Sequence, residues 1–139
     1  MPSVQRIIYL IGLGLLGLSS QIPSQAACLH YEPTKVLIRG TLEQRTFPGP
    51  PNFESIEKGD AAETGYYLKP GKPVCTQARP DEELSSYQNQ RLIQLVLSHQ
   101  QYQQLQPQLG QTVRLKGSLF ESSTGHHHTP VLMTVLSLE

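Results

Sequence analysis

The chain has 139 residues, with eleven Lys and Arg against eleven Asp and Glu, so its formal net charge at neutral pH is zero. This charge balance lacks the basic surface that nucleic-acid binding usually needs, and we expect no nucleic-acid partner. The sequence contains no tryptophan, the residue that most often stacks on sugar rings. A chain of this length is large enough for one domain with a modest hydrophobic core.

The first residues have the three parts of a secretory signal peptide. Arg6 gives a positive start, residues 7–18 form an apolar run, and small and polar residues follow up to Ala26. The run is too short for a transmembrane helix, which needs roughly 20 apolar residues. We therefore predict a signal peptide over 1–26, cleaved after Ala26 or Ala27, and one domain over 27–139. The predicted location is periplasmic or secreted, without stable membrane insertion.

Cys28 and Cys75 are the two cysteines of the chain. In an exported protein, two cysteines most simply form a disulfide, because the compartment is oxidising. They lie too far apart for the C-x-x-C spacing of a redox-active or metal-binding pair. A lipid anchor on Cys28 is the alternative, although Gln25 stands where lipoprotein signals usually carry an apolar residue. We predict a Cys28–Cys75 disulfide.

Two strand patterns share one motif, V-x-[IL]-[RK]-G-[ST]-L. It occurs at Val36 to Leu42 and again at Val113 to Leu119, and in both the apolar residues alternate with polar or small ones. The central glycine of each strand predicts a sharp bend or the close approach of another backbone.

Between these strands the chain alternates short apolar runs with turn signals. Tyr66-Tyr67-Leu68 and Pro73-Val74-Cys75 flank Pro70-Gly71, which indicates either one bulged strand or two short strands joined by a turn. Residues 79–90 are polar, and we expect an exposed loop there. Residues 92–97 form an apolar run short enough for a buried strand.

A short helix follows. Ser98-x-x-Gln101 has the form of a capping box, and Gly110 is a natural stop. Pro107 limits the regular helix to roughly two turns, because it lacks a backbone donor. Residues 131–138 supply the last strand.

The predicted order is strand, strand, strand, helix, strand, strand. This order matches an OB-fold, a five-stranded, partly open Greek-key barrel with a short helix between its third and fourth strands. The alternative is a different small β-barrel or a β-sandwich. In an OB-fold, the loop after the first strand and the loop after the fourth strand flank one binding face.

The two most unusual loops of the sequence fall at these positions, in segments 43–65 and 121–130. The first is rich in proline and acidic residues, and the second contains three consecutive histidines. We therefore expect a groove between them. The candidate ligand-binding residues are Arg45, Asn52, Glu54, Asp60, His126, His127 and His128.

The histidines are open to several interpretations. His126 and His128 could bind zinc or copper, with Glu54 or Asp60 adding an oxygen ligand, because imidazole and carboxylate suit these metals. They could instead hydrogen-bond the opposite loop and hold its shape, or contact a non-metal ligand directly. A catalytic histidine would need a positioned nucleophile and an orienting carboxylate, and the sequence shows no such arrangement, so we expect no enzyme.

Several motifs resemble those of one family. They are Cys28 to Pro33, T-F-P-G-P-P-N-F-E-S-I from Thr46, P-V-C from Pro73 and T-G-H-H-H-T-P from Thr124. Together they are similar to a family of small secreted bacterial proteins with a domain of unknown function, marked by G-P-P-N-[FY]-E and G-H-H-H-T-P. The resemblance spans nearly all of residues 27–139. It implies secretion, a disulfide and a shared domain, without a mechanism.

These observations favour a non-enzymatic binding module of the bacterial envelope. Its ligand could be a cell-wall fragment, a small anion or another secreted protein. A metal-binding protein that uses His126 and His128, and an inhibitor of a secreted hydrolase, are the alternatives.

Overall fold

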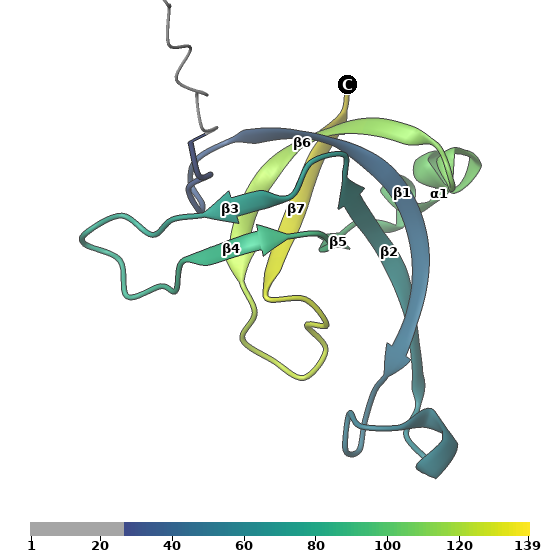
Figure 1. Ribbon diagram of the computed structural model, residues 1–139. Coiled ribbons are helices and arrows are strands. Elements are labelled where there is room, and N and C mark those ends of the chain that lie inside the picture. Colours follow the sequence, from purple (N-terminus) through teal and green to yellow (C-terminus); the bar gives the residue numbers. More distant parts are fainter. Residues whose placement is uncertain (1–26) are drawn as a thin grey trace, which may run out of the picture.

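The computed structural model describes residues 27–139, so the predicted signal peptide over 1–26 lies outside the described residues. Five strands form a mixed sheet whose hydrogen bonds close into a ring in the order β1, β2, β5, β7, β6 (Figure 1). Neighbours in the ring are antiparallel, except that β5 is parallel to β7. The strands are β1 (Val36–Pro48), β2 (Ala62–Pro70), β5 (Ile93–Val96), β6 (Thr112–Glu121) and β7 (Val131–Leu138). The fold is therefore mostly β, as the strand patterns predicted.

Alternation places one set of side chains inside the ring. Leu42, Leu68, Ile93, Leu115 and Met133 come from the five different strands, and all are fully buried. Successive side chains of a strand point to opposite faces, which explains why residues two apart share the core. Each fully buried side chain of this size stabilises the fold by about 1.5–3 kcal/mol relative to an exposed one.

The two motif glycines lie where another backbone comes close. A Cβ at Gly40 would stand 2.4 Å from the carbonyl oxygen of Lys69, and one at Gly117 would stand 2.2 Å from that of Thr134. Neither position has room for a side chain. Gly40 is also where β1, while still paired with β6, begins to pair with β2. Of the two predicted roles for these glycines, the close approach of a backbone is confirmed.

A second sheet of two strands lies beside the ring. It pairs β3 (Val74–Thr76) with β4 (Tyr87–Gln90). Because β2 ends at Pro70 and β3 begins at Val74, the interpretation of two strands joined by a turn is confirmed. The expectation of a loop through Gln90 was wrong at its end. Tyr87 pairs with Thr76 and donates its backbone N–H to the Thr76 hydroxyl at 3.3 Å, which a count of polar residues could not show. The predicted disulfide is present and joins Cys28 to Cys75 in β3.

The helix begins and ends as its motifs predict. Helix α1 (His99–Leu105) continues into the 3₁₀ helix η2 (Gln106–Gln108), ten residues together. Ser98 and Gln101 form the capping box, in which each side chain accepts a hydrogen bond from the other residue's backbone N–H. No helix among residues 27–139 is long and apolar enough to cross a membrane.

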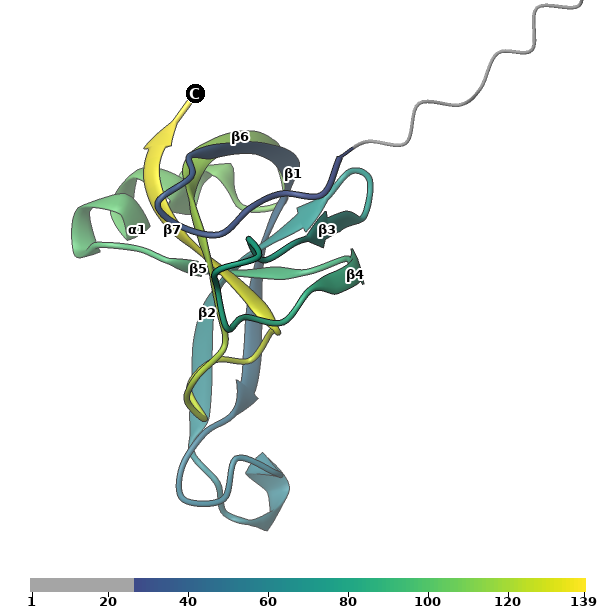
Figure 2. The same ribbon diagram turned by 90° about the vertical axis from the view of Figure 1, so that its left-hand side faces the viewer.

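Strands β1 and β2 continue beyond the ring as a two-stranded arm. The first strand was predicted to end at Leu42, but β1 runs to Pro48 because its last residues pair with the first residues of β2. The hydroxyls of Thr46 and Thr64 hydrogen-bond across this pair at 2.7 Å. Residues 49–61, with the 3₁₀ helix η1 (Ile56–Lys58), form the tip of the arm. Figures 1 and 2 show this tip and the loop between β6 and β7 at the same end of the molecule.

Candidate functional site

The loop at the tip of the arm is organised around one buried carboxylate. Asp60 accepts hydrogen bonds from the backbone N–H groups of Asn52, Glu54 and Ser55, at 2.9, 2.8 and 2.8 Å, and from the Asn52 side chain at 3.2 Å. The backbone hydrogen bonds, that of Ser55 foremost, lower the pKa of Asp60 below its usual value. Asp60 therefore fixes the shape of loop 49–61.

The histidine loop, residues 122–130, is held by β5. The side-chain amide of Gln94 donates to the carbonyl of His126 at 3.0 Å and accepts from the backbone N–H of His128 at 2.6 Å. The buried Thr129 hydroxyl accepts from the Gln94 backbone N–H at 3.0 Å and donates to the carbonyl of Val131 at 2.7 Å. These contacts fix the backbone on both sides of His127.

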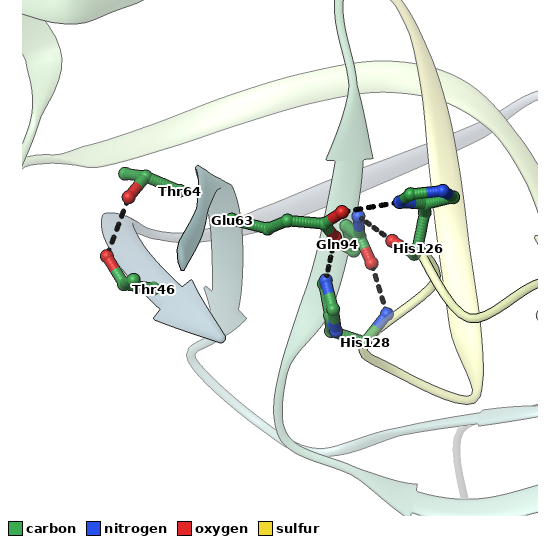
Figure 3. Close-up of polar contacts among 6 residues, drawn as sticks. All are labelled: Thr46, Glu63, Thr64, Gln94, His126 and His128. Atoms are coloured by element: carbon green, nitrogen blue, oxygen red, sulfur yellow. Dashed lines mark hydrogen bonds and ion pairs between the residues drawn. The ribbon is translucent and has the colours of Figure 1, made fainter. Parts of the chain in front are cut away.

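Glu63 joins the arm to the histidine loop. Its two carboxylate oxygens accept separate hydrogen bonds, from His126 Nδ1 at 2.5 Å and from His128 Nε2 at 2.7 Å (Figure 3). A carboxylate can only accept, so both ring nitrogens carry hydrogen here. The side chain of His128 is 9% exposed, that of Glu63 25% and that of His126 63%. We call the surface made by Glu63, the tip loop 49–61 and the histidine loop 122–130 the rim.

Aromatic rings and two glycines shape the rim. Phe47 stacks on His128 with ring centroids 5.0 Å apart, and Phe53 meets His126 edge-on at 5.2 Å. A Cβ at Gly49 would stand 2.6 Å from Cγ of Glu63, and one at Gly125 would stand 2.9 Å from the Phe53 ring. Gly49 and Gly125, which begin the motifs G-P-P-N-F-E and G-H-H-H-T-P, therefore leave the space that the side chains of Glu63 and Phe53 occupy.

The rim keeps Glu63 ionised. Burial alone would raise the pKa of this carboxyl, but the hydrogen bonds from His128 and His126 outweigh burial, and the pKa lies below its usual value. At neutral pH, Glu63 is therefore a carboxylate whose remaining lone pairs can accept from a ligand.

A pocket of about 260 Å³ opens beside Glu63, where β2 separates from β5. Tyr67 and Tyr102 line it, and the two hydroxyls come within 3.9 and 4.0 Å of the place where a Cβ of Gly65 would stand. Neither hydroxyl hydrogen-bonds to another group among residues 27–139, and no solvent-shielded side-chain polar atom there lacks a partner, so the Tyr67 hydroxyl faces solvent in the pocket although the residue as a whole is only 1% exposed. The full lining consists of Glu63, Thr64, Gly65, Tyr67, Gln94, Leu95, Tyr102 and His128.

Both tyrosines remain protonated donors at neutral pH. Burial, with smaller contributions from Tyr102 and Glu63, raises the pKa of Tyr67 to about 12. Burial also raises the pKa of Tyr102, with a further contribution from Tyr66. The pocket thus combines two O–H donors with one carboxylate acceptor.

The structure brings two of the predicted site residues together, His126 and His128, through Glu63. His127 turns back into its own loop, where Nδ1 accepts from the Ser123 N–H at 2.9 Å. The other four predicted residues lie along the arm. Arg45 pairs with Glu43 in β1, Asn52 and Asp60 bond to each other, and Glu54 is exposed with its backbone N–H on Asp60.

The pocket residues Tyr67, Gln94 and Tyr102 were not among the predicted site residues, and neither was Glu63. Strand alternation contains the signal for Glu63, because residues 63, 65 and 67 share one face of β2. Using that signal required knowing that β2 begins at Ala62, which depends on its pairing with the end of β1.

The histidine cluster differs from a preformed metal centre. Among the described residues, no group of three or more His, Cys, Asp or Glu side chains is arranged to hold a metal ion. His126 and His128 face different oxygens of one carboxylate, and that carboxylate is Glu63. Asp60, which the metal interpretation offered as an oxygen ligand, is occupied by the tip loop.

The described chain is a small, mostly β protein with one disulfide and a rim built by two distant segments. Residues 92–139 match the family model of a domain of unknown function, DUF4431. This match includes Gln94, Tyr102 and the G-H-H-H-T-P motif, whereas Glu63 and G-P-P-N-F-E precede it. No curated protein and no solved structure matches the chain.

Proposed function

We propose that the protein is a non-enzymatic binding module that acts in the periplasm or outside the cell. Its ligand occupies the groove between segments 43–65 and 121–130, at the pocket beside Glu63 and His128. A disulfide between Cys28 and Cys75 supports an oxidising compartment, because thiols stay reduced in the cytosol.

The arrangement of the strands supports an OB-fold-like architecture for this module. In the ring, the helix lies between the third and fourth strands, β5 and β6, and the only parallel pair joins the third and fifth, β5 and β7. OB-folds bind ligands on the face flanked by the loops after the first and fourth strands. Here those loops form the rim, next to the pocket.

The observation that carries the proposal is the hydroxyl of Tyr67. Its ring is buried, but the hydroxyl hydrogen-bonds to no other group among the described residues and faces the pocket, where a ligand can accept from it. A ligand acceptor placed between Tyr67 and Tyr102 satisfies both hydroxyls. The same ligand can donate to Glu63, whose oxygens each retain acceptor capacity.

This donor and acceptor pattern favours a ligand that carries amide groups. An amide offers a carbonyl to the two tyrosines and an N–H to Glu63, within about 260 Å³. Among envelope molecules, cell-wall fragments carry both acetamido and peptide amides. We therefore assign a cell-wall fragment as the ligand class, ahead of a small anion, which Glu63 would repel.

The test is a titration of the ¹⁵N-labelled protein with the uncharged diamide of N-acetylmuramyl-L-alanyl-D-glutamic acid, followed by NMR. We expect shift changes in the amides of residues 63–67, 94–95 and 126–128. Tyr67→Phe and Tyr102→Phe keep the rings and remove the hydroxyls, so each should weaken binding by about tenfold, the effect of one lost hydrogen bond in a desolvated site. Tyr87→Phe is the matched control, because that hydroxyl bonds to Glu121 outside the pocket.

Binding that is equal in all four proteins, or no shift change at millimolar fragment, contradicts the assignment. Shift changes confined to other surfaces contradict the proposed groove.

Metal binding is the second candidate function, because two imidazole nitrogens of the histidine loop face the carboxylate of Glu63 in β2, although they are not arranged as a preformed metal site. A metal would have to replace the two hydrogen bonds of Glu63 with coordination by the same three side chains. Calorimetric titration of the tag-free protein with zinc or copper, beside His126→Ala/His128→Ala, tests it. Micromolar or tighter binding that is lost in the variant supports a metal site, and its absence leaves the cluster as rim structure.

A further inference from the structure

A second feature lies at the other end of the molecule, where β1 crosses β6. Arg39 and Arg114 stand directly opposite each other in the antiparallel pair, and both are exposed. Side chains opposite each other in such a pair lie on the same face with Cβ atoms about 5 Å apart, and like charges placed there repel. Lys72, in the turn after β2, lines a pocket together with Arg39. We call Arg39, Arg114 and Lys72 the cation cluster.

The cluster has no acidic partner among the described residues. None of its three members forms an ion pair among residues 27–139. Glu139 donates its backbone N–H to the carbonyl of Arg114, but its side chain accepts from the Ser137 hydroxyl at 2.6 Å. Residues 1–26 contain no Asp or Glu. No acidic side chain among residues 27–139 therefore relieves the repulsion between Arg39 and Arg114.

Two adjoining pockets meet at Arg39 and Lys72, and Arg114 stands beside them as the cross-strand neighbour of Arg39. The larger, about 430 Å³, is lined by Arg39, Lys72 and the hydroxyl-bearing Thr41 and Thr112. The smaller, about 290 Å³, shares Arg39 and Lys72. Its remaining wall is largely apolar and includes Leu29, Leu37, Pro73 and Val74.

Leu37 makes the apolar half of this groove accessible. It is two residues before Arg39 on the same outward face of β1, and it is 48% exposed. A ligand that is anionic at one end and apolar at the other would place its charge on the cluster and its apolar part along Leu37. Burial of the apolar part adds to the affinity in proportion to the apolar area removed from water.

We propose that this groove binds a single phosphate-bearing amphiphile, separately from the site at the rim. Phosphate suits the cluster better than a carboxylate, because a phosphate monoester carries between one and two negative charges at neutral pH and three acceptor oxygens. Guanidinium groups bind such oxygens in pairs, and Lys72 adds a third positive charge. The hydroxyls of Thr41 and Thr112 supply further donors in the same pocket.

The binding test uses dodecyl phosphate below its critical micelle concentration, measured by calorimetry with the purified protein at low ionic strength. Inorganic phosphate and dodecyl maltoside are the two reference ligands, the first without the tail and the second without the charge. We expect dodecyl phosphate to bind more tightly than either one, and its affinity to fall as salt is added.

Variants locate the site. Arg39→Gln and Arg114→Gln should each weaken dodecyl phosphate binding by about tenfold, the loss of one charge-assisted hydrogen-bonding group. Leu37→Ser should weaken dodecyl phosphate and leave inorganic phosphate unchanged. Lys58→Gln is the control, since it removes one positive charge from η1 at the tip of the arm, away from the groove.

Three results overturn the proposal. Equal binding of dodecyl phosphate and dodecyl maltoside shows that the charge has no role, and equal binding of inorganic and dodecyl phosphate shows that the apolar wall has none. Sedimentation with phosphatidylglycerol vesicles, without binding of monomeric dodecyl phosphate, indicates a membrane surface as the partner. Because the rim lies at the other end, Tyr67→Phe should leave dodecyl phosphate binding unchanged.

Discussion

At the rim, the carboxylate oxygens of Asp60 and Glu63 accept hydrogen bonds that hold the tip loop and the histidine loop. At the other end, Arg39 and Arg114 stand opposite each other without an acidic partner among residues 27–139. The charged groups of the rim therefore shape the protein itself, and neutralising one should destabilise it. The cation cluster has no such internal role. Neutralising one of its members should cost no stability and should affect only what the groove binds.

Both ends depend on contacts between segments that are far apart in sequence. At the rim, Glu63 joins β2 to the histidine loop. Beside the groove, the disulfide joins Cys28 to Cys75 in β3. The first junction consists of hydrogen bonds and ring contacts, and the second is covalent. Their removal should therefore differ in size as well as in location.

The largest effect should come from Cys28→Ser/Cys75→Ser. Loss of a bridge that spans 47 residues lowers the free energy of unfolding by roughly 4 kcal/mol in the chain-entropy model. Urea unfolding of the variant and the parent measures this difference. Equal midpoints would contradict it. Because the rim has its own contacts, the amide shifts of residues 122–130 should stay near those of the parent wherever the variant is folded.

At the rim, Glu63→Gln should destabilise the protein by about 1 kcal/mol, because one amide oxygen cannot replace two carboxylate oxygens that accept from His126 and His128. Hydrogen exchange at residues 122–130 should accelerate. Glu57→Gln in η1 makes the same change in charge on an exposed side chain, and we expect the stability of the parent. A histidine loop that exchanges at the same rate in Glu63→Gln and the parent would mean that Glu63 does not hold it.

The pH dependence of stability distinguishes the two carboxylates from ordinary surface groups. The pKa values of Asp60 and Glu63 are lowered in the folded protein, while an unfolded carboxyl has a pKa of about 4. The unfolded state thus binds more protons in this range, and the stabilisation, complete above about pH 5, is lost as the pH falls through the folded pKa values. Urea midpoints between neutral and acidic pH should show this fall. The difference between Glu63→Gln and the parent should shrink toward acid, and a constant difference would contradict the assignment.

Local patterns were sufficient to predict much of this fold. Alternating apolar residues located β6 and β7, a short apolar run located β5, the capping box at Ser98 located the helix, and the two glycines marked backbone crossings. The end of β1 and strand β4 were missed because their residues are polar, and pairing with a partner strand decides their structure. No local pattern encodes that partner.

The site was predicted only in outline. The motifs around Gly49 and Gly125 pointed correctly to the two loops that come together, since both glycines leave space for contacts across the rim. The residue that joins them, Glu63, lies outside both motifs, and the pocket tyrosines, Tyr67 and Tyr102, look like core residues in sequence. Their importance depends on which hydroxyl lacks a partner, and that is a property of the assembled fold.

The smallest predicted effect compares the two ends most directly, because removal of one positive charge should raise the stability at one end and lower it at the other. Arg39→Gln relieves the repulsion from Arg114 and should raise stability at low salt by a few tenths of a kcal/mol. Arg45→Gln removes a cation paired with Glu43 and should lower stability by a similar amount. Added salt screens both interactions, so the two variants should converge on the parent as ionic strength rises. Urea unfolding at two salt concentrations measures all three proteins, and a loss of stability in Arg39→Gln at low salt would mean that Arg39 has a partner within the fold and that the cluster is not free to bind an anion.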